Sequence, residues 1–303
     1  MLSFSTCWNS GRHKRGEAML NEIAELGFTH VELGHGIRLS LMEGVRRFHE
    51  KGRVRITSLH NFCPLPVEVQ RASPNCYEFT SHRPADRRRA IKLTLQTIDW
   101  AAQLGASLVI LHLGRVPGPD RTRRLIAMAE AGELNSRAYI RTKLAAVRHR
   151  EAASARAMAR AKEALLPILE HAANKNIRLG IEGRESYEEL PSEREFPALL
   201  EELNSPWAGY WHDIGHIQLK ENLGFVDHAE WLRTIRPRTL GCHLHDVAWP
   251  ASDHRAPFTG SIDYDKLVPL LPENCLFVWE MSPRRSREEI LAARARWIER
   301  FGE

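Results

Sequence analysis

The sequence predicts an α/β protein that folds as a single (β/α)8 barrel, and three observations lead to this prediction. Short apolar segments of strand length alternate with longer segments of helical period, which is typical of βα units around a parallel sheet. There are eight segments of each kind, the number that closes a barrel. Successive apolar segments also end in a histidine or a carboxylate. The predicted strands span residues 2–6, 30–34, 54–60, 107–113, 178–182, 209–213, 240–245 and 276–281.

The predicted helices lie between these strands and after the last one. Leu26-Gly27 and Leu104-Gly105 place glycine where a helix must turn left-handed before the next strand, so we expect helices to end there. They span residues 16–26, 40–51, 84–104, 153–174, 197–203, 228–235, 265–271 and 286–301.

The whole chain, residues 1–303, is predicted to form one domain. Its composition, 43% hydrophobic and 27% charged, suits a globular protein with a sizeable core. Residues 61–83 and 115–150 are longer than ordinary barrel connections, and both follow strand ends at the face where such barrels bind ligands. We therefore expect long loops at the active face in these two places.

The charge of the chain points to two kinds of surface. A formal net charge of +5 and a pI near 9.1 would suit a phosphorylated or nucleic-acid partner. Much of the excess arginine, however, lies in two expected helices, around residues 87–89 and from 121 to 150. Solvated helix faces are the simpler explanation, so a nucleic-acid partner is not favoured.

The sequence also argues against several classes of protein. No segment reaches the roughly 18 uninterrupted apolar residues of a membrane span, and no signal-peptide core begins the chain, so we expect a cytoplasmic protein without a membrane partner. The five cysteines include no CxxC pair, which argues against a disulfide framework and a thiolate zinc site. The glycines at 114, 118 and 132 are too scattered for a nucleotide-binding motif, so no nucleotide cofactor is predicted. Nitrogen and oxygen atoms must hold any metal.

Ionisable residues gather at the ends of six successive predicted strands. In a parallel barrel these ends open on one face, so side chains distant in the sequence converge near the axis. Several carboxylates there would repel one another in a low-dielectric cleft, and a divalent metal is the simplest neutraliser. Each residue alone has a plain structural reading as a packed histidine or an ion pair, but together they favour a shared metal site. They are His60, His112, Glu182, Asp213 with His216, His243 with His245, and Glu280.

These residues carry a resemblance that covers nearly the whole chain in the order of its elements. The chain resembles the xylose-isomerase-like TIM-barrel family of sugar phosphate isomerases and epimerases, whose superfamily also contains the apurinic-site DNA repair endonucleases. The matching features are the run LGFTHVEL at 26–33, Glu182, the step DIGH at 213–216, the run HLHD at 243–246 and Glu280.

The resemblance implies a set of metal ligands. Carried over residue by residue, they are Glu182, Asp213, one histidine of the seventh strand and Glu280. His243 and His245 lie two residues apart and share a strand face, so both could look inward. His243 is favoured because an acid, Asp246, follows it three positions later, and His245 remains the alternative. Such a mixed oxygen and nitrogen site suits manganese, magnesium, cobalt or zinc.

The resemblance also implies a reaction, the isomerisation or epimerisation of a sugar or sugar phosphate. Glu182 and Glu280 would transfer protons on opposite sides of the substrate through an enediolate, and the metal would polarise the carbonyl. His216 would contact a substrate hydroxyl or the metal. Arg115 and Arg184 are candidates to bind a substrate carboxylate or phosphate. Trp8 could stack on a sugar face, and His60 and His112 are further substrate-binding candidates.

Two other functions remain open, as does oligomeric state. His60, His112, His216 and His254 also match most ligand positions of the three-zinc endonucleases, although Ser252 stands where an acid is expected. With several metals bound, the chain could hydrolyse a phosphodiester. A barrel that binds a sugar without turnover is the third reading. The family resemblance makes a homodimer plausible.

Overall fold

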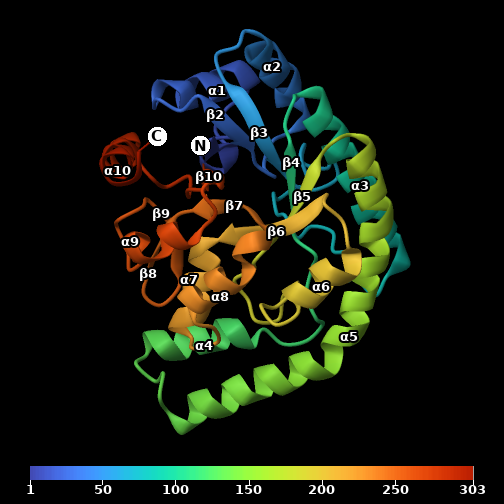
Figure 1. The fold of residues 1–303 in the computed structure, drawn as a ribbon, viewed down its shortest axis with the longest axis vertical. Coiled ribbons are helices and arrows are strands. Elements are labelled where there is room, and N and C mark those ends of the chain that lie inside the picture. The colour runs from blue at the N-terminus through green and yellow to red at the C-terminus, as the bar shows by residue number, and fades with distance from the viewer. Residues whose placement is uncertain (303) are drawn as a thin grey trace.

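Eight parallel strands close into a barrel in this computed structural model, which describes residues 1–302. Around the barrel the strands follow the order β1, β10, β7, β6, β5, β4, β3 and β2, each hydrogen-bonded to its neighbours and β2 closing onto β1. Figure 1 shows the strands at the centre and the helices outside them. The strands are β1 Leu2–Ser5, β2 His30–Leu33, β3 Arg55–His60, β4 Leu108–Leu111, β5 Arg178–Glu182, β6 Ala208–Asp213, β7 Thr239–Leu244 and β10 Leu276–Trp279.

The helices alternate with the strands and cover the outside of the barrel. They are α1 Gly16–Glu25, α2 Leu39–Glu50, α3 Pro84–Gln103, α4 Arg121–Glu130, α5 Arg137–Asn174, α6 Phe196–Leu203, α7 Ile214–Asn222, α8 His228–Ile235, α9 Tyr264–Leu267 and α10 Arg287–Phe301. Short 3-10 helices occupy Thr6–Trp8, Arg236–Arg238 and Val268–Leu270. The predicted (β/α)8 fold is therefore confirmed, and every predicted barrel strand is present with ends shifted by two residues at most.

The predicted helix ends at Gly27 and Gly105 are also confirmed. Their φ angles are 87° and 67°, in the left-handed region that a side chain disfavours. At both places the chain turns from an outer helix into the next barrel strand. Short turns therefore connect α1 to β2 and α3 to β4.

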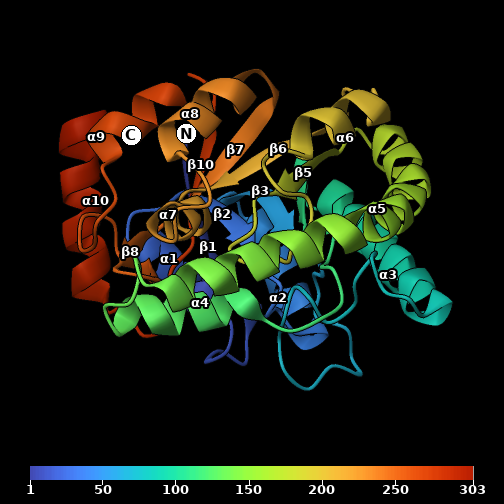
Figure 2. The same ribbon diagram turned by 90° about the horizontal axis from the view of Figure 1, so that it is seen from below.

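Two helical predictions need correction. The segment 121–150 is neither one helix nor a long loop: α4 ends near Gly132, whose φ is 76°, and Ser136 caps a new helix by accepting the Tyr139 amide. The helix predicted at 153–174 thus begins at Arg137 and runs for 38 residues. Figure 2 shows α4 and the first part of α5 crossing one side of the molecule together. Leu125 and Tyr139 pack there against Leu219 of α7.

The sequence pattern missed α7 and a two-stranded hairpin, β8 Asp246–Ala248 with β9 Ser252–Arg255. Every residue of 214–220 in α7 is buried, so the helix lacks the alternation of apolar and polar faces that reveals surface helices. Asp213 caps this helix by accepting the His216 amide. The last residue of β6 therefore starts α7 directly.

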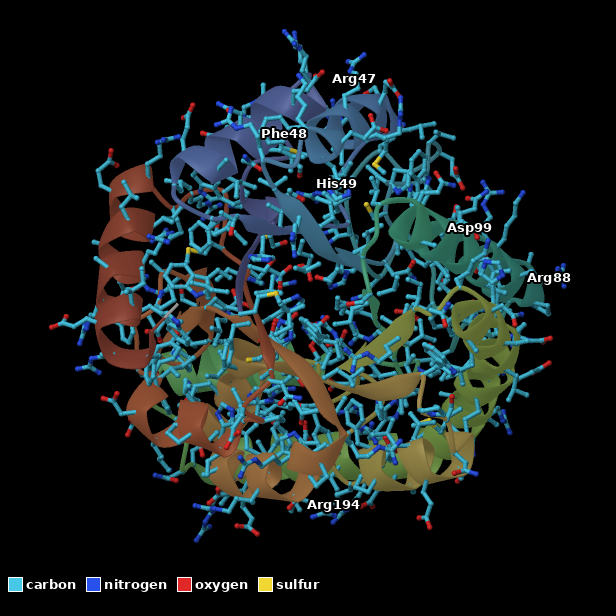
Figure 3. The ribbon with its side chains drawn as sticks, turned by 45° about the horizontal axis from the view of Figure 1, so that its top comes forward. Arg47, Phe48, His49, Arg88, Asp99 and Arg194 are labelled. Atoms are coloured by element: carbon cyan, nitrogen blue, oxygen red, sulfur yellow. The ribbon has the colours of Figure 1, made fainter. Side chains whose placement is uncertain are left out.

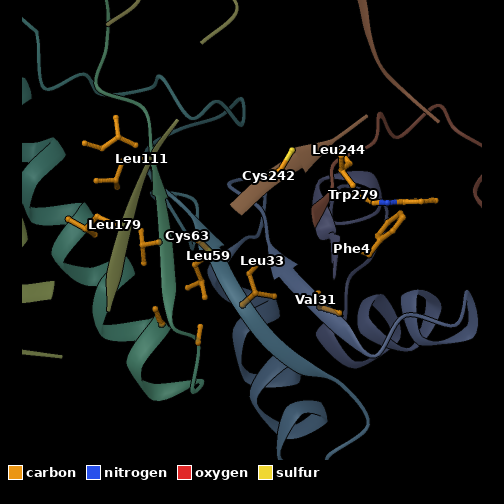
Figure 4. Packing of buried hydrophobic residues seen from close by; sticks show 14 of the residues in the cluster. Phe4, Val31, Leu33, Leu59, Cys63, Leu111, Leu179, Cys242, Leu244 and Trp279 are labelled. Carbon is orange, nitrogen blue, oxygen red and sulfur yellow. The ribbon is translucent and has the colours of Figure 1, made fainter. Parts of the chain in front are cut away.

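The strands separate two apolar regions by the alternation of their side chains. Val109 and Leu111 belong to the large core between strands and helices, part of which Figure 4 shows, whereas Leu108 and Ile110 belong to a smaller cluster with Trp211. A Cβ at Gly241 would lie 2.3 Å from the Trp211 ring, so this glycine makes room for the indole. Trp211 thus fills the barrel beneath the carboxyl ends of the strands.

The charged helix faces lie outside, as expected. Arg47 of α2 and Arg88 of α3 are exposed, and Figure 3 shows them at the edge of the molecule. Within residues 1–302, no helix combines the length and apolar character needed to cross a membrane.

Candidate metal centre and active site

Four residues from neighbouring strands meet at the carboxyl ends of the barrel. Glu182 ends β5, Asp213 ends β6, His243 lies in β7 and Glu280 follows β10. One nitrogen or oxygen atom from each lies within 4.8 Å of the others. All four side chains are buried, with at most 5% of each residue exposed. Parallel register produces this convergence, because Asp213 pairs with His243 and Glu182 pairs with Trp211 just below.

His243 presents one ring nitrogen to the three carboxylates. Its Nδ1 lies 3.3 Å from Glu280 Oε2, 3.4 Å from Glu182 Oε1 and 3.7 Å from Asp213 Oδ2. Its Nε2 lies 3.2 Å from Glu32 Oε1 on the other side of the ring. Glu32 is a buried carboxylate that also accepts from Ser58, so it is placed to accept the Nε2 proton of His243 while Nδ1 faces the other three residues.

Glu182 has the densest set of polar neighbours in this group. Its Oε2 accepts from His112 Nε2 at 2.7 Å and lies 3.1 Å from His60 Nε2. Its Oε1 accepts from Arg184 Nη1 at 3.3 Å. His60 and His112 therefore point at the Glu182 carboxylate and not into an open cavity. Arg184, two residues after Glu182, contacts the same carboxylate.

Buried charge governs the ionisation of this group. Burial alone would raise the pKa of Glu182, but His112 and Arg184 hold that pKa well below its ordinary value. Burial, with Arg184 nearby, lowers the pKa of His112 to about 3, so its neutral ring donates to Glu182. For Asp213, His216 and His245 likewise outweigh burial and hold the pKa well below its ordinary value. Both carboxylates are thus available as anionic ligands.

His216 lies at the start of α7, beside two of the carboxylates. Its amide donates to Asp213 Oδ1 at 2.8 Å, and its Nδ1 lies 3.4 Å from both Glu182 Oε1 and Asp213 Oδ2. The helix cap thereby fixes the histidine against the metal-ligand group.

Of the two histidines near the end of β7, His243 belongs to the group of four. His245 lies to one side, where its Nε2 donates to Asp213 Oδ1 at 3.0 Å and its Nδ1 accepts the His254 amide at 2.9 Å. Both of its nitrogens are therefore engaged by the protein. His245 orients Asp213, while His254 Nδ1 lies 3.1 Å from the Glu280 carbonyl oxygen.

A cavity of about 710 Å³ opens beside the group of four. Glu280, His254 and His35 are among the residues that line it. Loops that follow β1, β2, β3 and β10 form the remaining walls. A ligand in this cavity would therefore reach Glu280 directly.

Three predicted substrate contacts are placed differently from the expectation. Trp8 is only 1% exposed: the Arg12 guanidinium covers its ring at 4.0 Å and its indole donates to the Arg285 carbonyl, so it is a core residue that cannot stack on a sugar. Arg115 lines a separate cavity of about 350 Å³ with Glu78. Arg184 is buried against Glu182 and Glu189, so its charge serves the site's own carboxylates.

Sequence reasoning missed several residues that shape the site. Asn75 Oδ1 lies 2.8 Å from His112 Nδ1, and Glu189 pairs with Arg184 at 3.1 Å. Trp211 packs edge-on beneath His243, with ring centroids 5.1 Å apart. Glu32 could be noticed in the sequence, because it lies inside the predicted strand at 30–34. A carboxylate buried there needs a polar partner, which in the structure is His243.

The donor set fits a divalent metal. Three carboxylates and one imidazole offer oxygen and nitrogen atoms of the kinds that magnesium, manganese, cobalt and zinc accept. Three buried carboxylates this close repel one another strongly, and a cation would remove that repulsion. The His243 nitrogen that faces them, Nδ1, is the one turned away from Glu32.

Comparison with known proteins places the chain among similar barrels. An uncharacterized protein of Sinorhizobium fredii, y4fM, is 24% identical over 287 residues, which cover 87% of this chain and 80% of that protein. The structure of a D-tagatose 3-epimerase-like protein matches with a TM-score of 0.70, 16% identity and coverage of 98% of this chain and 96% of the other. The 3-keto-D-glucoside 4-epimerase YcjR of E. coli matches with a TM-score of 0.66, 13% identity and coverage of 97% and 98%.

The structure of D-allulose 3-epimerase from Methylomonas sp. in complex with D-allulose also matches, with a TM-score of 0.67, 16% identity and coverage of 98% and 96%. At these identities the structural matches establish the fold. The family described as xylose isomerase-like TIM barrel matches residues 20–301, nearly the whole chain. The chain therefore belongs to the xylose isomerase-like TIM barrel family.

Proposed function

We propose that this protein is a divalent-metal-dependent isomerase or epimerase of a sugar or sugar derivative. The observation that carries the proposal is the buried group of Glu182, Asp213, His243 and Glu280, with ligand atoms within 4.8 Å of one another, beside a cavity that Glu280 lines. Similar barrels include a D-tagatose 3-epimerase-like protein, a D-allulose 3-epimerase and a 3-keto-D-glucoside 4-epimerase, which supports a sugar as the substrate.

The metal ligands in this proposal are the four residues of the group, with the His243 Nδ1 atom as the nitrogen donor. A bound divalent ion would polarise the substrate carbonyl and offset the negative charge that develops on its oxygen. Asp213 is fully buried and ends its strand, and in this proposal it serves as a ligand only. His60 and His112 hold Glu182 in place, and Glu32 holds His243.

The chain's own glutamates move the protons. One glutamate removes the proton from the carbon beside the carbonyl, and an enediolate forms as the electron pair moves to the oxygen. The other glutamate returns a proton. In an epimerisation the proton goes to the opposite face of the same carbon. In an isomerisation it goes to the former carbonyl carbon, after the hydroxyl on the deprotonated carbon has passed its proton to the former carbonyl oxygen. Glu280 lines the cavity, whereas hydrogen bonds from His112 and Arg184 hold Glu182 ionised as a base.

Glutamine variants test the proton transfers. Glu182→Gln and Glu280→Gln should each lower turnover of a ketose panel by about 10²-fold to 10⁴-fold. Exchange of the substrate proton with deuterated water should fall with turnover. Glu188→Gln is the matched control, because Glu188 is as buried as Glu182 but binds Thr122 instead.

Metal content must be measured in every variant, since both glutamates are also proposed ligands. Loss of turnover with metal retained supports proton transfer. If the wild-type protein loaded with manganese, magnesium, cobalt or zinc turns over no sugar in a broad panel, the proposal fails and a sugar-binding barrel without turnover is the better reading.

A second candidate, a metal-dependent phosphodiesterase, rests on further groups of ligand atoms. His216, His245 and His254 form one such group, and His60, Glu182 and His243 form another. Two or three bound ions could clamp both oxygens of a phosphodiester. Elemental analysis separates the candidates: about one equivalent favours the isomerase, and cleavage of an abasic-site duplex that a chelator abolishes favours the hydrolase. The engaged nitrogens of His245 count against a full second site.

A further inference from the structure

Another cavity opens at the opposite end of the barrel, where the strands begin. Its volume is about 420 Å³, and residues at the starts of β2, β3, β4, β5 and β10 are among those that line it. Leu108 and Leu276 lie between this cavity and the metal-ligand group, because both belong to the cluster around Trp211, and Trp211 packs against His243. A ligand in this cavity would therefore not touch the proposed active site.

The alternation of side chains along the strands turns basic residues toward this cavity. Arg178 lies four residues before Glu182 in β5, so it shares the inward face of that strand. His30 lies two residues before Glu32 in β2 and likewise faces inward. Arg55 of β3 is the register partner of His30. All three basic residues line the cavity.

These basic side chains have no carboxylate near them. Within residues 1–302, neither Arg55 nor Arg178 forms an ion pair, and no aspartate or glutamate lines the cavity. His49 of α2, which Figure 3 shows inward of Arg47, adds a fourth basic side chain. Burial and the Arg55 guanidinium both lower the pKa of His30, so positive charge surrounds that ring. A concave site with charge of one sign concentrates ions of the opposite sign.

The deeper part of the cavity is apolar. Leu108 and Leu276 line it and are at most 9% exposed, whereas Arg55 and Arg178 are exposed. An apolar group on the leucines gains about 25 cal/mol for each Å² that it removes from water. The volume also falls in the range of roughly 300–1,000 Å³ that holds small organic ligands. A bare inorganic ion would leave the leucines uncovered.

We propose that this cavity binds a small organic oxyanion, whose charged oxygens lie at Arg55 and Arg178 and whose apolar body lies on Leu108 and Leu276. A guanidinium donates two parallel hydrogen bonds to a carboxylate or to a phosphate group, so the oxyanion can be of either kind. The inference goes beyond the proposed function and does not depend on the reaction at the metal centre.

Four probes test the inference by calorimetry with the metal-loaded full chain: benzoate, phenyl phosphate, inorganic phosphate and benzyl alcohol. Inorganic phosphate lacks the apolar body, and benzyl alcohol lacks the charge. We expect benzoate or phenyl phosphate to bind about tenfold more tightly than either of these two, and the tighter aromatic anion identifies the preferred oxyanion. If neither aromatic anion exceeds both inorganic phosphate and benzyl alcohol, the inference is overturned.

A double variant assigns the binding to this cavity. Arg55→Gln with Arg178→Gln should weaken the aromatic anion about tenfold, because both guanidinium groups are lost. Both arginines are exposed and unpaired, so the fold should survive, and denaturant unfolding checks that it does. Arg88→Gln with Arg141→Gln removes two exposed arginines elsewhere and makes the same change in net charge, so it should leave the affinity unchanged. An equal affinity in the two double variants overturns the inference.

Crystals of the wild-type protein soaked with para-bromobenzoate locate the ligand without any variant. The anomalous signal of bromine should lie over Leu108 and Leu276, at the amino ends of the strands. Bromine found only in the cavity that Glu280 lines would place the anion at the metal centre and overturn the inference. None of these measurements requires turnover of a sugar, so failure of the proposed function leaves their outcome unchanged.

Discussion

Glu32 and His243 face each other inside the barrel, with Oε1 of the carboxylate 3.2 Å from Nε2 of the imidazole. Both side chains are fully buried, and the second glutamate oxygen accepts from Ser58 at 2.8 Å. The contact orients the ring, with Nε2 toward Glu32 and Nδ1 toward Glu182, Asp213 and Glu280. A residue of β2 thus orients a proposed metal ligand of β7.

Glu32→Gln should weaken divalent-metal binding by about 10-fold to 100-fold, because a neutral amide no longer holds the proton at Nε2 of His243. A competition titration with a metal indicator measures the affinity directly. Ser58→Ala serves as the milder companion, since it removes one hydrogen bond to Glu32 and keeps the carboxylate. An unchanged affinity in Glu32→Gln would show that His243 is oriented without Glu32.

Arg184→Met should move the acid limb of the activity profile to higher pH. Arg184 lies 3.3 Å from Glu182 and helps to lower the pKa of that carboxyl, so loss of the cation raises the pKa and protonates Glu182 at a higher pH. The measurement is kcat against pH, and Arg184→Lys should keep the limb near its wild-type position. A limb that stays in place in Arg184→Met would contradict this role.

Gly215→Ala should destabilise the fold and disturb Asp213. A Cβ at Gly215 would lie 2.0 Å from the His245 ring, which cannot move without breaking its bonds to Asp213 and to the His254 amide. We expect a loss of about 1–3 kcal/mol in the free energy of unfolding, with weaker metal binding. Denaturant unfolding measures the loss. Gly11→Ala is the control, because nothing lies within 4 Å of its Cβ position.

His228→Gln should reduce the loss of stability in acid. Burial, with His212 nearby, lowers the pKa of His228 well below 6.5, so the folded ring stays neutral while the unfolded chain binds a proton. Stability from this residue is present above pH 6.5 and is lost as pH falls below it, at up to about 1.4 kcal/mol per pH unit. Denaturant unfolding of the metal-free wild type and variant between pH 7 and pH 4.5 gives the slope of the unfolding free energy against pH for each protein.

The variant should show a shallower slope than the wild type over that range. His82→Gln, at an exposed position, tests whether the change belongs to the buried ring. Equal slopes in the wild type and His228→Gln would contradict the prediction.

Much of the fold followed from local patterns. Apolar runs of strand length, helical periods between them and the glycines at 27 and 105 predicted the barrel, because each of these signals acts within a few residues. The helix α7 was not predicted because it is buried on all sides and so lacks the polar face that gives a surface helix its alternation of apolar and polar residues. The break between α4 and α5 escaped because both helices share one arginine-rich composition.

The ionisable side chains at the strand ends could be read from the chain alone, since parallel strands in a closed barrel must finish on one face. The choice between His243 and His245 needed the folded chain: side chains alternate between the two faces of the sheet inside β7, and this alternation stops at His245, which follows the last strand residue. It also turned Trp8 into the core and Arg184 onto Glu182. Packing between segments that are distant in the sequence sets where these side chains point. The spacing of residues along the chain does not indicate it.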